Sequence, residues 1–562
     1  MTIRDYFDRA VRSRPDAPFM RFCGRGSAAW QTLSYAQTAA RVQAAFAALA
    51  PLGLEPRRDI AAFMLPNSPE WIVLYLALSG AGVAVSPFDP KLRAVEARHI
   101  LSDSGASALF AQTAQAGTVA EAAKGLKSLR TIVWTDAADD ASAPSVPGFA
   151  CRALASLEGS CCTPPAKAAA AYAAARPSED DMASLIYSSG TTGSPKGVML
   201  SHGNFSANVT ATLARVGFSA SDSFMNVLPL FHAFSFTGNF LLPLCVGASV
   251  TFARSVRTLA EDLVQTSPTI LLAVPLLAEK LYARIDAQIK KSLVASGLFK
   301  FGFSRKIVAR KIVERFGGKL RLLGIGGAPT SVETLEGFKK IGLFVLEGYG
   351  ITECCPGVAY PCPESFVPGT VGPVLDSYEW KLANVDGTGV GELLLKGPSV
   401  MKGYWRNEEQ TKAAFDEDGF YRTGDIVRID KSGNVAICGR CKSLIVNREG
   451  KNIYPEEVER PIEHSPLIKD ILVLGWRAKG ETGEHVGAIA VPDADAVAAH
   501  LKRDFLSREE LVAFTSSYIL GVCRASVADY KIPRKIEVRL EPLERTPSLK
   551  IKRALYAGAL DE

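Results

Sequence analysis

The stretch Tyr187–Val198 reads Y-S-S-G-T-T-G-S-P-K-G-V and follows the apolar run Met182–Tyr187. A short apolar run that ends in polar and glycine residues is typical of a buried strand. A helix is expected to begin near Ser201, because serine is a favourable N-cap residue. The spacing around Lys196 differs from the G-x-x-x-x-G-K-[ST] nucleotide motif. The stretch therefore predicts a glycine-rich loop of a different kind, between a strand and a helix.

This loop combines backbone freedom with hydrogen-bond donors. Its glycines, Gly190 among them, permit positive φ and let the backbone approach a bulky anion. Hydroxyl groups and exposed backbone N–H groups can donate to phosphate oxygens, and Lys196 adds a compact positive charge. The hydroxyl donors are Ser188, Ser189, Thr191, Thr192 and Ser194. A phosphate-binding loop explains this combination better than a flexible surface loop.

Length and composition limit the classes of protein. The chain has 562 residues, 48% of them hydrophobic and 22% charged, which is the balance of a folded protein of about two to four domains. The net charge of +6 is small, and no Lys/Arg stripe with interleaved aromatics occurs, which argues against a nucleic-acid partner. The 11 cysteines are an odd number at low density, and the N-terminus has no apolar signal core, so a cytoplasmic location is expected.

The longest apolar stretch, Trp71–Pro87, contains Ser79, Gly80 and Gly82. It is shorter than the roughly 20 residues that a membrane-spanning helix needs. A buried helix followed by a strand explains it better, which leaves at most a peripheral membrane contact.

Short apolar runs alternate with helical patterns through most of the chain. Helices are expected at Ser68–Leu78 and Ser331–Lys340, each with serine at the N-cap. The expected strands are Ile60–Leu65, Val83–Ser86, Ala108–Ala111, Thr131–Trp134, Ile270–Val274 and Leu320–Ile325. This alternation predicts an α/β protein with doubly wound, mostly parallel sheets.

The pattern changes along the rest of the chain. The alanine-rich segment Ala166–Ala175, preceded by two prolines, is interpreted as a surface linker. After about residue 370, shorter β segments with turns predict a small β-rich subdomain. From about residue 443 a compact α+β pattern follows, with strands near Ile471–Gly475, Val486–Val491 and Ile536–Leu540 and a helix near Ser507–Tyr518. A large N-terminal part and a small C-terminal part are therefore predicted.

The loop and six later motifs resemble, in the same order, the signatures of the adenylate-forming superfamily, which includes acyl-CoA synthetases, peptide-synthetase adenylation domains and luciferases. The resemblance covers nearly the whole chain. The later motifs are Gly326-Gly-Ala-Pro, Glu347-Gly-Tyr-Gly-Ile-Thr-Glu353, Tyr421-Arg-Thr-Gly-Asp425, Gly439-Arg-Cys-Lys442, Asn452-Ile-Tyr-Pro-Glu-Glu-Val-Glu459 and Thr546-Pro-Ser-Leu-Lys550. The resemblance implies an enzyme that uses ATP and Mg²⁺ to convert a carboxylic acid to an acyl-adenylate, and then transfers the acyl group to a thiol such as that of coenzyme A.

The resemblance also implies a role for each matching residue. Thr352 contacts the α-phosphate, Glu353 holds Mg²⁺, and Lys550 is catalytic. Lys442 is the hinge between an adenylation domain, residues 1–441, and a mobile C-terminal domain, residues 442–562. The implied nucleotide-binding residues are Ser188, Ser189, Gly190, Thr191, Thr192, Lys196, Gly326, Gly327, Ala328, Gly348, Tyr349, Gly350, Asp425 and Arg440.

The formation of an acyl-adenylate requires these residue types independently of the resemblance. A carboxylate that attacks the α-phosphate brings two anions together, so hydroxyls, N–H groups, a lysine and Mg²⁺ must offset the repulsion. Glu353 is a hard oxygen ligand that suits Mg²⁺, and the triphosphate supplies further ligands. Asp425 taken alone is more simply explained as a turn residue, and only its order after the other motifs favours a role in ribose binding.

The segment Phe231–Phe240 is aromatic and aliphatic and lacks the aspartate with which amino-acid-activating relatives bind an ammonium group. We therefore expect an apolar acid, a medium- or long-chain fatty acid first and an aryl acid as the alternative. His232 matches a position that contacts or gates the substrate carboxylate in the superfamily, and a structural core role is an equal alternative.

The thiol acceptor is less well defined. Leu549 stands before Lys550 where many relatives have glycine, and Asn447–Lys451 departs from the usual glycine pair in a segment that helps to receive coenzyme A. Three hypotheses follow: an acyl-CoA ligase, a ligase that delivers to a separate acyl carrier protein, and a catalytically silent scaffold protein. The presence of Lys196, Glu353 and Lys550 argues against the third.

Overall fold

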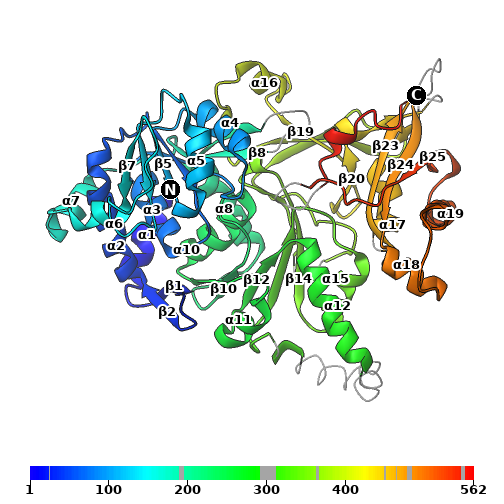
Figure 1. The fold of residues 1–562 in the computed structure, drawn as a ribbon, viewed down its shortest axis with the longest axis horizontal. Helices are drawn as coiled ribbons and strands as arrows, with labels where there is room; N and C mark the ends of the chain where they lie inside the picture. The colour runs from blue at the N-terminus through cyan, green and yellow to red at the C-terminus, as the bar shows by residue number, and fades with distance from the viewer. Residues whose placement is uncertain are drawn as a thin grey trace. The chain divides into compact units, whose positions relative to one another are not determined.

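The computed structural model describes residues 1–24, 26–188, 195–291, 312–314, 316–362, 366–447, 451–463, 465–477, 484–545 and 551–561, without the side chains of 288–291. These residues form two compact units (Figure 1). The larger comprises Met1–Ser188, the described residues of 195–379, and Leu395–Tyr421. The smaller comprises Trp380–Leu394 and the described residues from Arg422 onwards.

The first sheet of the larger unit has eight strands in the order β15-β14-β13-β12-β10-β11-β1-β2. All neighbours are parallel except the two edge pairs, β14 with β15 and β1 with β2. The strands are β1 (Pro18–Cys23), β2 (Trp30–Ser34), β10 (Ser223–Asn226), β11 (Ser249–Phe252), β12 (Ile270–Ala273), β13 (Leu322–Gly326), β14 (Phe344–Gly350) and β15 (Gly357–Ala359). This arrangement confirms the predicted mostly parallel sheet.

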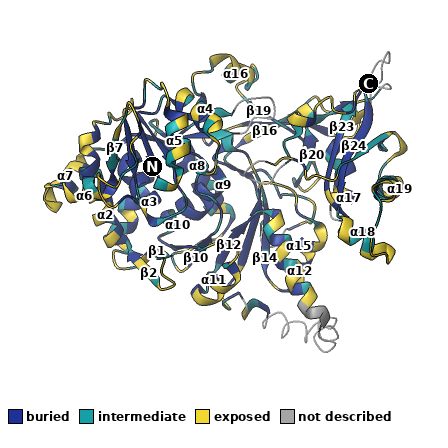
Figure 2. Cartoon of the chain, viewed as in Figure 1, coloured by how far each residue is buried: buried dark blue, intermediate teal, exposed yellow. Residues whose placement is uncertain are grey.

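The second sheet also has eight strands, in the order β18-β9-β8-β4-β3-β5-β6-β7. It is parallel from β8 to β7, and the edge strands β9 and β18 are antiparallel to their neighbours. The strands are β3 (Ile60–Met64), β4 (Ala84–Pro87), β5 (Ala108–Ala111), β6 (Thr131–Trp134), β7 (Ala150–Ala153), β8 (Met182–Ser188), β9 (Lys196–Ser201) and β18 (Gly403–Tyr404). Figure 2 shows the strands as mostly buried, as expected for parallel sheets covered by helices.

Helices cover these sheets, and side chains cap several of them. Ser68, Ser201 and Ser331 accept from backbone N–H groups at the first turns of α3, α8 and α15, as the sequence predicts. The α-helices of this unit are α1 (Ile3–Ser13), α2 (Tyr35–Leu49), α3 (Pro69–Ser79), α4 (Ala94–Ser104), α5 (Ala116–Ala123), α6 (Leu154–Gly159), α7 (Pro165–Ala174), α8 (His202–Arg215), α9 (Ala233–Ser235), α10 (Leu242–Val246), α11 (Leu259–Thr266), α12 (Pro275–Lys291), α15 (Val332–Lys340) and α16 (Glu408–Ala413). The shorter turns are η1 (Ala50–Leu52), η2 (Thr113–Gln115), η3 (Phe236–Leu241, a π-helix) and η4 (Thr352–Cys354).

Helix α3 lies in the interior of the larger unit and accounts for the apolar stretch 71–87. Every residue of α3 except Glu70 is buried, which fits a helix that is apolar on all sides. The Tyr75 hydroxyl lies 2.8 Å from the Ser184 hydroxyl of β8, and its ring packs edge-on against Phe236 of η3 at 4.9 Å. The helix therefore connects the second sheet to the segment that follows His232.

The interpretation of residues 166–175 as a surface linker is wrong. They form most of α7, which begins with proline, a residue that suits the first turn of a helix. Tyr172 is buried, its ring lies 5.3 Å from that of Phe46 in α2, and its hydroxyl donates to the Leu76 carbonyl at 2.6 Å. A run of strong helix formers with one aromatic anchor is a packed helix here, although its composition resembles a linker.

The smaller unit is built around three sheets. A four-stranded sheet has the order β16-β17-β19-β20, a two-stranded sheet pairs β21 with β22, and a three-stranded sheet has the order β23-β24-β25. The strands are β16 (Glu379–Ala383), β17 (Val390–Lys396), β19 (Tyr421–Ile429), β20 (Val435–Arg440), β21 (Ile445–Val446), β22 (Asn452–Ile453), β23 (Ile468–Trp476), β24 (His485–Pro492) and β25 (Lys535–Val538). The helices are α17 (Pro455–Glu463), α18 (Ala494–Leu501) and α19 (Arg508–Ser526), with short turns η5 (Cys441–Ser443), η6 (Asp529–Lys531) and η7 (Arg553–Tyr556).

The β-rich and α+β patterns of the C-terminal sequence both lie in this unit. Ile519 of α19 and Val458 of α17 share a buried core with Val473 and Ala488 of the three-stranded sheet. Most of the four-stranded sheet belongs to the same compact unit as these residues. The smaller unit therefore includes residues that precede position 441. A compact unit does not locate a hinge, and the domain boundary at Lys442 stays a prediction.

Candidate active site

The phosphate-binding loop predicted from the sequence joins β8 to β9. Ser188 ends β8, and Lys196, which begins β9, is its partner across the antiparallel pair. The loop residues Ser189, Gly190, Thr191 and Thr192 lie outside the described residues. The predicted helix start near Ser201 is confirmed, since Ser201 caps α8 and the helix begins at His202; strand β9, which was not predicted, lies between the loop and this helix.

A carboxylate from the first sheet lies beside this hairpin. Glu353 sits in η4, just after β14. Its Oε1 atom accepts from the Tyr404 hydroxyl at 3.1 Å and from the Ser188 hydroxyl at 3.5 Å. The Lys196 ammonium lies 5.0 Å from the centre of the Tyr404 ring. One side chain of β18, Tyr404, thus joins the predicted metal ligand to the predicted phosphate-binding lysine.

The backbone around Glu353 is held from several sides. Its carbonyl accepts from the Met401 N–H at 2.8 Å. The Asn208 amide of α8 donates to the Cys354 carbonyl at 3.0 Å, and the Thr237 hydroxyl donates to the Cys355 carbonyl at 2.7 Å. These bonds fix the turn that carries the carboxylate, as a site with a defined geometry requires.

Two tyrosines beside Glu353 keep their protons at neutral pH. Burial and the Glu353 carboxylate raise the pKa of Tyr404, and burial raises the pKa of Tyr421 well above its ordinary value. The side chain of Tyr421 lies close to that of Tyr404. The sequence predicted no role for either tyrosine, although Tyr421 begins one of its motifs.

The predicted adenine-binding segments lie together at the carboxyl ends of two parallel strands. Gly326 of β13 is aligned with Gly348 of β14. Ligands bind at the carboxyl ends of strands in open α/β sheets. Gly327 has φ +94°, which favours glycine, and a Cβ atom on Gly350 would overlap the Pro356 carbonyl oxygen. Tyr349 is half-buried beside these glycines, and Ala328 is exposed.

His232 directly precedes α9 and is half-buried. Its segment is attached to the sheet through Asn67, which donates to the Leu228 carbonyl at 2.8 Å and accepts from the Leu230 N–H at 2.8 Å. Further along, Phe236 and Phe240 are fully buried in the core. Only the first part of the predicted aromatic lining, from Phe231 to Phe234, therefore includes side chains that remain partly accessible.

The smaller unit contains the predicted ribose-binding pair. Asp425 of β19 lies opposite Arg440 of β20, and the Arg440 Nε atom is 2.8 Å from the Asp425 carboxylate. The Asp425 side chain is 4% exposed and that of Arg440 42%. Asp425 is thus a strand residue and not a turn residue. Lys442 is exposed in η5, and Lys550 lies outside the described residues.

The donor set fits magnesium carried by a nucleotide. Among the described residues, no group of three or more His, Cys, Asp or Glu side chains could hold a metal ion. Glu353 is one hard oxygen ligand with the Ser188 hydroxyl close by, and Mg²⁺ in such sites takes one or two carboxylates together with phosphate oxygens.

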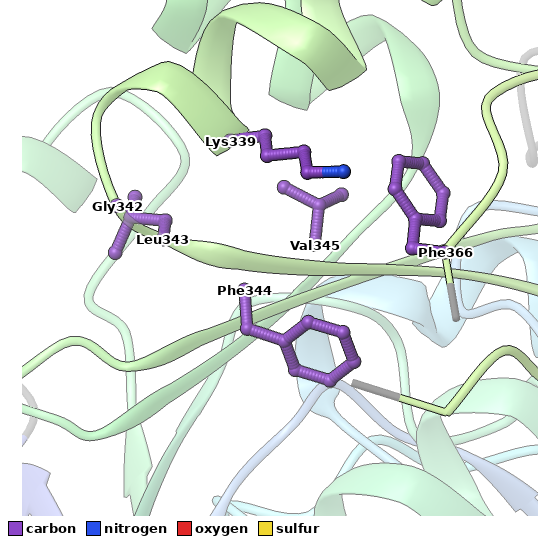
Figure 3. A pocket seen from close by; sticks show the side chains of 6 residues that line it. All are labelled: Lys339, Gly342, Leu343, Phe344, Val345 and Phe366. Carbon is purple, nitrogen blue, oxygen red and sulfur yellow. The ribbon is translucent and has the colours of Figure 1, made fainter. Parts of the chain in front are cut away.

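A cavity of about 270 Å³ opens at the other end of β14. It is lined by Lys339, Gly342, Leu343, Phe344, Val345 and Phe366. Figure 3 shows Lys339, Val345 and Phe366 on one side of the strand and Phe344 on the other. Phe344 begins β14 whereas Glu353 follows its carboxyl end, so this cavity is separate from the candidate active site.

Comparison with known proteins agrees with this geometry. The family of AMP-binding enzymes matches residues 7–405. The long-chain-fatty-acid–CoA ligase FadD15 of Mycobacterium bovis is 29% identical over 94% of this chain and 91% of its own length. The long-chain-fatty-acid–CoA ligase of Escherichia coli is 29% identical over 96% of this chain and 91% of its own length. The ATP-bound crystal structure of MatB from Rhodopseudomonas palustris is 25% identical, with a TM-score of 0.73 over 99% of this chain and 98% of that one.

The two-sheet fold and the clustered lysine, hydroxyl and carboxylate define the class as an α/β nucleotide-binding enzyme. The family match extends over well more than half of the sequence. The chain belongs to the family of AMP-binding enzymes. Within the described residues, none of the helices is long and apolar enough to cross a membrane.

Proposed function

We propose that this enzyme activates a medium- or long-chain fatty acid with ATP and transfers the acyl group to coenzyme A. The observation that carries the proposal is the convergence of Ser188, Lys196 and Glu353 at one edge of the second sheet. The similarity to long-chain-fatty-acid–CoA ligases over nearly the whole chain supports the fatty acid and coenzyme A as substrates.

In the first half-reaction a substrate carboxylate oxygen attacks the α-phosphorus, and the bond to the β-phosphate oxygen breaks to release pyrophosphate. Lys196 and the loop hydroxyls offset the negative charge of the phosphates. Glu353 would hold Mg²⁺, which neutralises phosphate charge when bound. Thr352 contacts the α-phosphate, and Lys550 completes the charge stabilisation.

Roles in nucleoside binding fall to residues that the superfamily resemblance assigns. Tyr349 stacks on adenine, next to the glycine-lined segment 326–328. Asp425 accepts hydrogen bonds from the ribose hydroxyls, and Arg440 holds the carboxylate of Asp425 in place.

In the second half-reaction the coenzyme A sulfur attacks the acyl carbonyl carbon, and AMP leaves with its phosphate oxygen. The C-terminal domain, residues 442–562, rotates about Lys442 between the two steps, since domain closure turns on a few loop positions. We propose a cytoplasmic enzyme with at most peripheral membrane contact. The free thiols of all 11 cysteines support a reducing compartment.

A separate acyl carrier protein is the alternative acceptor, and an aryl acid the alternative substrate. One assay separates these functions: release of pyrophosphate over a panel of fatty and aryl acids, with and without coenzyme A. We expect release with fatty acids and formation of acyl-CoA. Release without acyl-CoA formation would favour a carrier protein, and an absence of release with every acid would identify a silent scaffold protein.

A further inference from the structure

Tyr404 occupies the space between the two charged groups of the candidate active site. Its hydroxyl donates to Glu353 Oε1 at 3.1 Å, while its ring faces the Lys196 ammonium at 5.0 Å. The side chain is buried, and so is that of Tyr421, which lies beside it. Because the Tyr404 hydroxyl donates to the carboxylate, its oxygen is available to accept from Tyr421. We call the two phenols and the carboxylate the tyrosine relay.

The backbone beneath this relay is anchored on both sides. Tyr404 lies on β18, which pairs with β9 so that Tyr404 is opposite Val198, two residues after Lys196. The Trp405 N–H donates to the Gly197 carbonyl at 2.8 Å, and the Tyr404 N–H donates to the Thr411 hydroxyl at 2.9 Å. The phenol therefore projects from a fixed strand, and its hydroxyl can hold a flexible glutamate side chain in one orientation.

The hydrogen bond from Ser188 to Oε1 is weaker than that from Tyr404. The Ser188 hydroxyl is 3.5 Å away, at the outer limit of a hydrogen bond. Ser188 also ends the strand that leads into the phosphate-binding loop, so its hydroxyl can turn to a phosphate oxygen. The Tyr404 bond, by contrast, has no such competing role. A hydrogen bond to an ionised acceptor is about twice as strong as one between neutral groups.

We propose that Tyr404, supported by Tyr421, is a positioning residue that holds Glu353 in the orientation in which its carboxylate binds the nucleotide-borne divalent cation. This inference rests on the proposed function, because it requires Glu353 to be a metal ligand. Hydrogen bonds to a ligating carboxylate typically change metal affinity or activity by about 10–100-fold.

The test measures Mn²⁺ binding to the full chain in the presence of a non-hydrolysable ATP analogue, by the loss of the electron paramagnetic resonance signal of free Mn²⁺. Tyr404→Phe keeps the ring beside Lys196 and removes one hydroxyl. We expect it to weaken Mn²⁺ binding about tenfold. Tyr421→Phe should weaken binding less, and the double variant should equal Tyr404→Phe, because Tyr421 acts only through Tyr404.

Tyr172→Phe is the matched control, since it removes a buried tyrosine hydroxyl that donates to a backbone carbonyl elsewhere in the same unit. It should leave Mn²⁺ binding unchanged. Glu353→Gln separates the two levels of the reasoning. If Glu353→Gln leaves Mn²⁺ binding intact, the metal role of Glu353 and the relay both fail. If Glu353→Gln abolishes binding but Tyr404→Phe does not weaken it, only the relay fails. Should Tyr404→Phe fail to fold, unchanged binding in Tyr421→Phe overturns the relay.

Discussion

The buried histidine at the start of α8 makes the stability of the larger unit depend on pH. His202 is fully buried, and its Nδ1 atom accepts from the Ile3 N–H of α1 at 3.3 Å. Burial lowers the pKa of this imidazole from 6.5 to about 4. Protonation would place a second donor against the Ile3 N–H and a charge in a buried position, and the nearby Asp181 and Asp5 carboxylates offset only part of this cost, so the folded protein keeps the ring neutral.

The sign and size of the effect follow from linkage. The folded pKa is the lower one, so the unfolded chain binds the proton first as the pH falls. The stabilisation is complete above pH 6.5 and is lost as the pH approaches 4. Between pH 6.5 and pH 5 the loss is about 1.5 pH units at about 1.4 kcal/mol per unit, or about 2 kcal/mol.

The assay is urea unfolding at pH 8 and pH 5, followed by tryptophan fluorescence, for the native sequence and for His202→Gln. The glutamine cannot titrate, so the loss of unfolding free energy between the two pH values should be about 2 kcal/mol smaller in the variant. All other titrating groups are common to both proteins and cancel. His500→Gln, at an exposed position of α18, should retain the full pH dependence. Equal pH dependence in the native protein and His202→Gln would refute the reasoning.

Three further changes test other parts of the molecule. Lys550→Ala should abolish pyrophosphate release but spare thioester formation from a supplied acyl-adenylate, and unchanged adenylation would contradict its assignment. Asp425→Asn should raise the KM for ATP about 10–100-fold in steady-state assays, because it loses charge-assisted bonds to ribose and the pair with Arg440; an unchanged KM would remove Asp425 from the site. Tyr172→Ala should lower the free energy of unfolding by about 3–5 kcal/mol in urea, because it empties the contact between α7 and α2. Lys167→Ala, on the exposed side of α7, is its control, and equal stability of the two variants would restore the linker interpretation.

Local patterns predicted most of the individual elements. The strands near residues 60, 108 and 131 and the caps at Ser68 and Ser331 agree with the structure. Each of these signals is contained in a few neighbouring residues, because strand burial and N-capping depend on short-range sequence. The motif order likewise pointed to the nucleotide chemistry before any contact was known.

The elements that the sequence misread depend on distant partners. β9 begins with Lys196 and Gly197, which read as loop residues, and it is a strand because β8 and β18 pair with it on both sides. The alanine-rich segment that forms α7 reads as a linker, and Tyr172 makes it a packed helix by reaching α2 and α3. In both cases tertiary contacts decided between alternatives that local propensity left close in energy.

The sequence by itself determined which groups are available for chemistry: the loop hydroxyls, Lys196 and Glu353, in a spacing that indicates binding of a nucleotide. Only the tertiary structure decided how these groups meet. Glu353 and Lys196 are far apart in the chain, and Tyr404, for which no motif indicated a role, joins them. The physical reason is that side-chain hydrogen bonds form only when the two atoms lie about 3 Å apart. Whether two distant residues come that close depends on the order and register of the strands, which no local sequence pattern encodes.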